Sequence, residues 1–288
     1  MIPKRVFFIF SDNKLSWTRY ISIKSCIKLN PGYEFFLYTF KQKNRTHSWI
    51  DDVKQDFFNY DGKDYMNELL KLPIITIPIN DEFVDEDLTI IHNTDLLRLQ
   101  ILITKGGFYA DTDILWLKSL DTLYKDIQHT DVGFMVEEFF YNCFLFGSPN
   151  NRFYELLHHQ AKMIADNHTY QSAGTHVFYY FTEYEKTIFK DNGAAPEMSE
   201  EFILQRMDYL KTWFGDLVFY RLPLKQIVPY LFNQTQLIFE KPNQPIPDSL
   251  GIHWFGGDNI SQKYNNIMNE SNIDNFNNLF IKVAKNYV

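Results

Sequence analysis

Two aspartates, Asp111 and Asp113, directly follow the short apolar run 108–110. Where a strand ends the chain turns, and both carboxylates can then converge on one cation. Mg²⁺ and Mn²⁺ are hard ions that take oxygen ligands, typically one or two carboxylates together with phosphate and water. Open α/β sheets also bind their ligands past the carboxyl ends of the strands. An isolated Asp-x-Asp pair occurs often by chance, so the surrounding elements decide whether it predicts a metal site.

Asp95 and Arg98 are a second candidate pair, three residues apart on one face of the helix expected over 93–105. As a local surface ion pair they would contribute about a few tenths of a kcal/mol. The helix is otherwise apolar, however, and charges on it are costly unless they are paired or face a polar cleft. A cleft that holds hydroxyl and phosphate groups would satisfy both charges. We therefore expect Asp95 and Arg98 to belong to a functional site.

The elements that must position these side chains begin with a β-α-β unit. Apolar runs predict strands over 6–10 and 34–40, with a helix over 18–29 between them that ends at Asn30-Pro31-Gly32. Such a unit predicts a parallel strand pair with a right-handed crossover.

The helix over 93–105 is the strongest in the sequence. Asn93 or Thr94 can cap its N-terminus, Asp95 favours its first turn, and Gly106 supplies its C-cap.

Later segments extend the same α/β pattern, with no repeat and no long linker. Further strands are expected over residues 74–79, 108–110, 131–137, 141–146, 217–220 and 250–255. Further helices are expected over residues 49–72, 152–167 and 174–186, and a polar, Asn-rich helical tail over 263–288. The fold class is therefore α/β, with a mixed, mainly parallel sheet flanked by helices, a more helical insertion and one domain over 1–288.

The composition excludes several classes of protein. The chain has 288 residues, of which 45% are hydrophobic and 22% charged, as in an average globular protein. Its net charge of −8, without a visible basic patch, argues against a nucleic-acid partner. Cys26 and Cys143 make no disulfide framework, and we expect both to be reduced and buried. The N-terminal apolar run is too short for a signal peptide, and no stretch reaches the roughly 18 apolar residues of a membrane span, so the sequence predicts a cytoplasmic protein.

The segment from Asp95-x-x-Arg98 through Gly106-Gly107-Phe108-Tyr109-Ala110-Asp111-Thr112-Asp113 resembles the Asp-x-Asp glycosyltransferases of the GT-A fold. It is most similar to glycosyltransferase family 32, with its initiating mannosyltransferases, inositol-phosphoceramide mannosyltransferases and capsular-polysaccharide transferases. The sugar-binding region of the large clostridial glucosylating toxins is a more distant relative. Residues 2–4 and 30–34, which precede the first two predicted strands, also match the pattern of the family. The resemblance covers residues 1–120 and is patchy thereafter.

The resemblance implies a Rossmann-like GT-A fold and specific roles for these residues. Asp113 would ligate Mn²⁺ or Mg²⁺ directly, and Asp111 would contact the donor's ribose or sugar and reach the metal partly through water. Asp95 would accept hydrogen bonds from the donor sugar, and Arg98 would hold the sugar or the diphosphate. Catalysis would then rest on electrostatic stabilisation by the metal and Arg98. The nucleotide is expected beside Tyr109 and near Phe8, Phe10 and Ser11 at the end of the first strand.

The run 252–261 (IHWFGGDNIS) resembles the late His-containing motif of many GT-A enzymes. The resemblance implies that His253 completes the metal shell, and a neutral imidazole suits Mn²⁺ better than Mg²⁺. The alternative is a strand-end histidine satisfied by a backbone carbonyl. The family usually has Ser-Trp shortly after the His, whereas this chain has Ser261-Gln262-Lys263-Tyr264. Lys263 is a candidate contact of the diphosphate.

The resemblance implies a metal-dependent hexosyltransferase that moves a hexose from a UDP- or GDP-sugar to a glycan, lipid-linked or protein acceptor, with retention of configuration. Residues 1–120 would bind the nucleotide-sugar, residues 121–262 would form the acceptor side and close the metal site, and residues 263–288 would be a tail. In relatives, an Asn like Asn142 lines the acceptor side.

Two other interpretations stay open. One is a non-catalytic sugar-nucleotide- or glycan-binding homologue, against which the intact carboxylates and Arg98 argue. The other is a phosphohydrolase with an aspartate nucleophile. That chemistry usually places the first Asp after a longer strand near the N-terminus, whereas Asp111 lies mid-chain after three strand residues.

Overall fold

A β-α-β unit opens the fold, as predicted. The computed structural model describes residues 1–11, 14–41, 60–80, 83–137, 139–165, 172–181 and 199–288. The strands β1 (Arg5–Phe10) and β2 (Glu34–Thr39) pair in parallel, and α1 (Trp17–Leu29) connects them. The side chain of Ser16 caps α1 by accepting a hydrogen bond from the Arg19 N–H.

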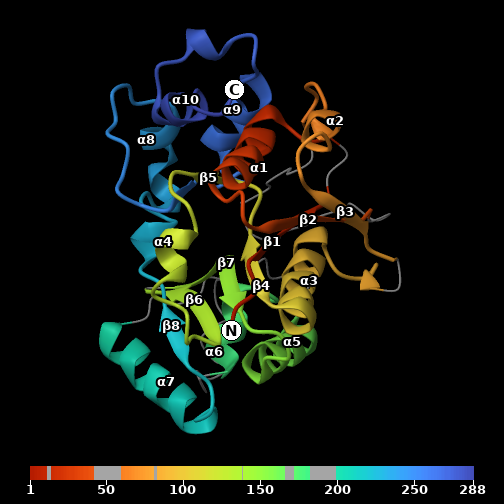
Figure 1. Ribbon diagram of the computed structural model, residues 1–288, viewed down its shortest axis with the longest axis vertical. Helices are drawn as coiled ribbons and strands as arrows, with labels where there is room; N and C mark the ends of the chain where they lie inside the picture. The colour runs from red at the N-terminus through yellow and green to blue at the C-terminus, as the bar shows by residue number, and fades with distance from the viewer. Residues whose placement is uncertain (12–13, 42–59, 81–82, 138, 166–171, 182–198) are drawn as a thin grey trace.

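Seven of the described strands form one mixed sheet in the order β3-β2-β1-β4-β7-β6-β8 (Figure 1). The strands from β3 to β4 are parallel, whereas β7 runs antiparallel to both of its neighbours and β8 is parallel to β6. The sheet is therefore mixed and mainly parallel, as predicted. Its remaining strands are β3 (Ile75–Pro78), β4 (Gly107–Ala110), β6 (Val132–Val136), β7 (Phe140–Gly147) and β8 (Phe219–Arg221).

A separate antiparallel pair joins distant parts of the chain. β5 (Ile114–Trp116) follows β4 closely, and β9 (Gly251–His253) comes from the C-terminal part. The strand predicted over 250–255 is therefore shorter than expected. Its last two residues leave the strand, because Phe255 takes a positive φ of 50°.

The helix α3 (Ile90–Lys105) starts earlier than predicted. Its N-cap is Thr89, whose side chain accepts from the His92 N–H, and not Asn93 or Thr94. Thr94 instead bonds the Ile90 carbonyl inside the helix, so Asp95 lies in the second turn and not in the first. Gly106 ends the helix as predicted, with φ of 61°, and a Cβ there would lie 2.6 Å from Pro149.

The other helices lie at two ends of the molecule (Figure 1). α8 (Thr235–Phe239), α9 (Asn259–Ile267) and α10 (Leu279–Ala284) gather near α1, whereas α5, α6 and α7 lie at the opposite end. The remaining bounds are α2 (Met66–Leu69), α4 (Asp121–Tyr124), α5 (Arg152–Ile164), α6 (Thr175–Phe181), α7 (Glu200–Trp213), η3 (Leu224–Gln226), η4 (Phe232–Gln234) and η5 (Ile273–Asn275).

Three predicted helices reach beyond the described residues. Of the helix expected over 49–72, residues 49–59 lie outside them, and only α2 is helical in the rest. The helix over 152–167 ends at Ile164, and residues 166–167 are not described. α6 confirms the start of the helix over 174–186, of which residues 182–186 are not described.

The tail over 263–288 was wrongly expected to be polar throughout. α9 already begins at Asn259, and α10 is buried in the main core. The ring of Phe280 lies 6.2 Å from that of Trp17 and 6.0 Å from that of Trp254. The short apolar sequence of α10 therefore covers α1. The Asn-rich residues around it make this core element hard to recognise in the sequence.

Two apolar clusters cover the two faces of the main sheet. Alternating residues of β1 divide between them, with Val6, Phe8 and Phe10 on the α1 side and Phe7 and Ile9 on the α3 side. Both cysteines are free and buried, as predicted. Among the described residues, none of the helices has the length and apolar character needed to cross a bilayer.

Candidate metal and sugar-nucleotide site

The Asp-x-Asp turn is fixed between the main sheet and the small strand pair. The Asp111 N–H donates to the Cys143 carbonyl at 2.8 Å, which extends the pairing of β4 with β7 by one bond. After the turn, Ile114 of β5 lies opposite His253 of β9. The Trp254 N–H also donates to the Asp113 carbonyl at 3.0 Å. This register brings a distant imidazole next to the second aspartate.

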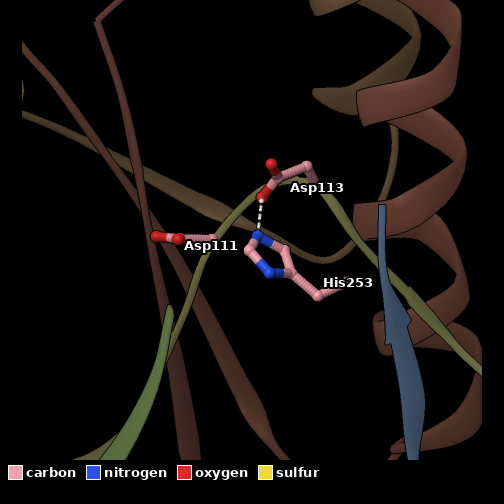
Figure 2. Close-up of side chains that lie close together, drawn as sticks. All are labelled: Asp111, Asp113 and His253. Carbon is pink, nitrogen blue, oxygen red and sulfur yellow. Dashed lines mark ion pairs between the residues drawn. The ribbon is translucent and has the colours of Figure 1, made fainter. Parts of the chain in front are cut away.

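Asp111, Asp113 and His253 form one cluster (Figure 2). One ligand atom from each side chain can be chosen so that all three lie within 4.8 Å of one another. The His253 Nε2 atom is 3.3 Å from Asp113 Oδ1, and the Gly256 N–H donates to the other carboxylate oxygen at 2.7 Å. The side chain of Asp113 is thus held from two directions.

The charges of this cluster suit a divalent cation. Burial alone would raise the pKa of Asp113, but the nearby His253, Arg19 and the Gly256 N–H hold it well below its usual value. Burial opposes a charged imidazole, yet Cys143 and Asp113 beside it raise the pKa of His253 well above its usual value. His253 therefore places a group that can carry positive charge beside the carboxylate of Asp113. Two carboxylates and one imidazole are a ligand set that Mn²⁺ accepts.

Arg98 organises the opposite side of Asp111. Its Nη2 atom lies 2.9 Å from Asp95 Oδ1 and 3.7 Å from Asp111 Oδ1, and its Nη1 donates to the Asn142 carbonyl at 2.7 Å. The guanidinium also lies 4.6 Å from the centre of the Tyr109 ring. Asp95 and Arg98 are 3% and 5% exposed, so the sequence correctly placed them together with Asp111, in a buried network.

Burial dominates the electrostatics of this network. It raises the pKa of both Asp95 and Asp111, and the charge of Arg98 opposes that shift without cancelling it. The Asn142 side-chain amide donates to Asp95 Oδ1 at 2.9 Å. The hydroxyl of Tyr109 donates to Asp111 Oδ1 at 2.5 Å. Each carboxylate of the network therefore has a fixed orientation before any ligand enters.

The other residues named from the sequence lie at different depths. Tyr109 is 1% exposed and its hydroxyl contacts Asp111. Phe8 and Phe10 are buried in the core on the α1 side, whereas Ser11, just after β1, is half-buried. Lys263 is exposed on α9, where its Nζ atom lies 3.5 Å from Glu240. Its Nζ atom also lies 5.3 Å from the centre of the Tyr264 ring, so the contacts of Lys263 are with its own end of the molecule.

Arg19 is a site neighbour that the sequence did not predict. It donates to the Thr112 hydroxyl between the two aspartates, and its guanidinium lies 5.6 Å from the centre of the Trp254 ring. Arg19 and Thr112 are 93 residues apart, and no spacing pattern links them.

Gly174 is a second such neighbour, from the segment before α6. A Cβ atom there would lie 2.6 Å from Asn142 Nδ2 and 2.7 Å from an Asp95 carboxylate oxygen. The backbone of Gly174 therefore covers Asp95 so closely that only glycine fits. The contact between Gly174 and Asp95 results from tertiary packing, so the sequence does not indicate it.

The mixed, mainly parallel sheet, with the Asp-x-Asp turn past one of its inner strands, matches the GT-A fold expected from the sequence. The family comparison agrees. Residues 18–130 match the family described as "Glycosyltransferase sugar-binding region containing DXD motif". The matched stretch contains Asp95, Arg98, Asp111 and Asp113, so the resemblance seen in the sequence is confirmed over these residues.

Solved structures of low sequence identity are also similar to this chain. PaToxG glycosyltransferase has a TM-score of 0.47 at 16% identity, over 73% of this chain and 76% of that one. The glycosyltransferase GlyE of Streptococcus pneumoniae has a TM-score of 0.43 at 13% identity, over 100% of this chain and 63% of that one. The galactosyltransferase LgtC has a TM-score of 0.29 at 16% identity, over 50% and 57%. A comparison of the sequence with curated proteins gives no match.

Proposed function

We propose that the protein moves a hexose from a UDP- or GDP-sugar to a glycan, lipid-linked or protein acceptor, in a reaction that requires Mn²⁺ or Mg²⁺. The observation that carries this proposal is the cluster of Asp111, Asp113 and His253, with ligand atoms within 4.8 Å, next to the buried Arg98. A diphosphate needs positive charge on both sides as it departs, and this arrangement offers a cation site and a guanidinium.

The metal would be held by Asp113 and His253, with Asp111 as the third ligand or as a partner through water. When bound, the ion would neutralise charge that develops on a diphosphate leaving group. Asp113 supports this assignment because its charge is already fixed by the Gly256 N–H. An imidazole in the set favours Mn²⁺ over Mg²⁺.

The donor sugar and diphosphate would lie on the Arg98 side. Arg98 would stabilise the departing phosphate, while Asp95 would accept from sugar hydroxyls, with its orientation set by Asn142. Tyr109 would act by fixing Asp111. The nucleoside would bind at the carboxyl end of β1, where Ser11 would contact it and Phe8 and Phe10 would lie beneath it. Lys263 would be an outer contact of the diphosphate.

The other expectations stay predictions. They are a single domain whose donor half ends near residue 120, an acceptor side over 121–262, retention of configuration and a cytoplasmic location. No nucleophile is assigned.

The test is hydrolysis of the donor by the purified protein. UDP- and GDP-sugars are incubated with Mn²⁺, Mg²⁺ or EDTA, and the release of UDP or GDP is measured. We expect one donor to be hydrolysed, and the release to be lost with EDTA and in Asp113→Asn. Asp248→Asn is the matched control, because that side chain is 95% exposed on the surface.

Two other outcomes are informative. Metal-dependent nucleotide binding without release, even when glycan acceptors are added, would favour the non-catalytic interpretation. If neither release nor Mn²⁺-dependent binding of UDP or GDP occurs, the metal assignment and the proposed function are both wrong.

A further inference from the structure

Arg19 brings a second guanidinium to the Asp-x-Asp turn, from a different element than Arg98. Arg19 lies in the first turn of α1, and its side chain donates to the Thr112 hydroxyl. The guanidinium also lies 5.6 Å from the centre of the Trp254 ring. A permanent positive charge is therefore fixed between the turn and the segment that follows β9.

The backbone at Gly256 lies close to both Arg19 and Asp113. A Cβ atom on Gly256 would lie 2.9 Å from Arg19 Nη2 and 3.2 Å from Asp113 Oδ2. The Gly256 N–H donates to that same carboxylate oxygen at 2.7 Å. Because this residue has no side chain, the guanidinium and the carboxylate proposed as a metal ligand can both approach it. Arg19 thus adjoins the place where a metal-bound diphosphate would lie.

The first turn of α1 is an unfavourable place for a cation. The N–H groups at the start of a helix carry partial positive charge, which favours carboxylates there and disfavours arginine. The first turn of α1 has no acidic residue, and Arg19 forms no direct ion pair within the part of the chain that the structure describes. The helix end and the guanidinium add their positive charge at one place, and an anionic ligand would balance both.

Arg19 also keeps hydrogen-bond donors for a ligand. A guanidinium carries several N–H donors in one plane, and among the described residues the Thr112 hydroxyl is the acceptor of one of them. The side chain of Arg19 is half-buried. Arg98, in contrast, is 5% exposed and is already held by Asp95 and the Asn142 carbonyl. Arg19 is therefore the more accessible of the two guanidinium groups.

We propose that Arg19 binds phosphate oxygens of the donor's diphosphate from the Asp113 side of the site, whereas Arg98 acts from the Asp111 side. This inference rests on the proposed function and adds a residue that recognises the phosphates rather than the sugar or the base. A departing nucleoside diphosphate carries more negative charge than one divalent ion neutralises. The planar fork of Arg19 supplies further positive charge and can donate two parallel hydrogen bonds to phosphate oxygens.

The test is calorimetric titration of UDP and GDP in the presence of Mn²⁺. We expect Arg19→Ala to raise the Kd of the nucleotide that the wild type binds by about 10- to 100-fold, the range of hydrogen bonds to a charged group. Arg19→Lys keeps the charge but loses the fork, so its Kd should lie between the two. Arg152→Ala is the matched control, because that side chain is 58% exposed on α5.

Thr112→Val separates phosphate contact from a structural role. It removes the hydroxyl that accepts from Arg19 and leaves the guanidinium in place, so we expect its nucleotide Kd to rise less than threefold. An effect through the metal would have the opposite sign, because loss of a nearby positive charge favours Mn²⁺ binding. A rise in Kd as large in Thr112→Val as in Arg19→Ala would show that Arg19 only holds the turn, and would overturn the phosphate contact.

Failure of this inference is distinguishable from failure of the proposed function. A wild-type protein without Mn²⁺-dependent binding of UDP or GDP would overturn the proposed function and the role of Arg19 with it. Normal binding by the wild type, with the same Kd in Arg19→Ala, would overturn the role of Arg19 alone.

Discussion

Asp111 and Asp113 are two residues apart, but their surroundings differ in kind. Asp111 belongs to a closed network in which Tyr109 and Arg98 both contact the same oxygen, Oδ1. Asp113 faces an imidazole on one oxygen and a backbone N–H on the other. Burial keeps the pKa of Asp111 raised, whereas the groups around Asp113 hold its pKa low despite burial.

The difference shows two ways of placing negative charge in an interior. The Arg98 side balances its carboxylates with a permanent guanidinium, so its integrity depends on that one cation. On the other side, His253 balances the carboxylate of Asp113. Because an imidazole can lose its proton, a metal ion can take the place of that proton. The Arg98 network is therefore a fixed ion-pair network, whereas the proton on His253 can be exchanged for a metal ion.

The largest expected effect comes from breaking the Arg98 side. Arg98→Ala leaves the buried Asp95, and the partly exposed Asp111 beside it, without their cation, which should lower the free energy of unfolding by about 3–5 kcal/mol. Urea denaturation followed by circular dichroism measures this change. His253→Ala, in parallel, should cost much less. Equal losses in the two variants would show that the Arg98 network is not the structural member of the pair.

The next effect concerns the metal. His253→Ala should weaken Mn²⁺ binding by about 10- to 100-fold while the fold is kept, because one ligand of the set is lost. Calorimetric titration with Mn²⁺ in the presence of UDP measures the affinity. The matched control is His159→Ala, an exposed histidine on α5. Unchanged Mn²⁺ affinity in His253→Ala would show that His253 is not a metal ligand and would favour the alternative, a strand-end histidine with a structural role.

Proton release sharpens the comparison further. Because the pKa of His253 is raised, its imidazole keeps a proton to higher pH than a free imidazole does, and coordination must displace that proton. Binding of Mn²⁺ should then release about one proton at pH 7, and its affinity should fall about tenfold for each pH unit of acidification. Titrations in two buffers of different ionisation enthalpy count the protons. Identical heats in both buffers would contradict the exchange.

The smallest effect is expected for Tyr109→Phe. The ring stays in the core and only the hydroxyl bond to Asp111 is lost, which should cost about 0.5–1.5 kcal/mol in stability. Thermal denaturation gives that change. Donor hydrolysis should fall by less than in Asp113→Asn. A loss of activity as complete as that of Asp113→Asn would mean that Tyr109 contacts substrate directly.

Local sequence patterns correctly predicted those parts of the fold that depend on interactions between residues close together in the chain. The strand–helix–strand opening and the Gly106 cap each follow from residues within a few positions of one another. The N-terminus of α3 was misplaced because Thr89, Asn93 and Thr94 are all good caps, and the packing of the preceding loop selects Thr89. α10 was missed as a core element because its burial depends on Trp17 and Trp254, which are distant in sequence.

The candidate site shows the same division. Asp95 and Arg98 are recognisable from one helix turn, and their approach to Asp111 was expected only through the resemblance. Arg19 and Gly174 reach the site through tertiary packing, so no spacing in the sequence indicates them.

The pairing of β5 with β9 has a consequence for how the protein is made. Both aspartates are synthesised well before β9, and the imidazole that completes their cluster arrives only with that strand. A chain released before residue 253 would carry the whole Asp-x-Asp turn without its third member. Chains fold from the N-terminus as they emerge, so the strands up to β5 can form first and still lack the complete cluster. The strand register thus makes completion of the cluster wait until β9 has been synthesised.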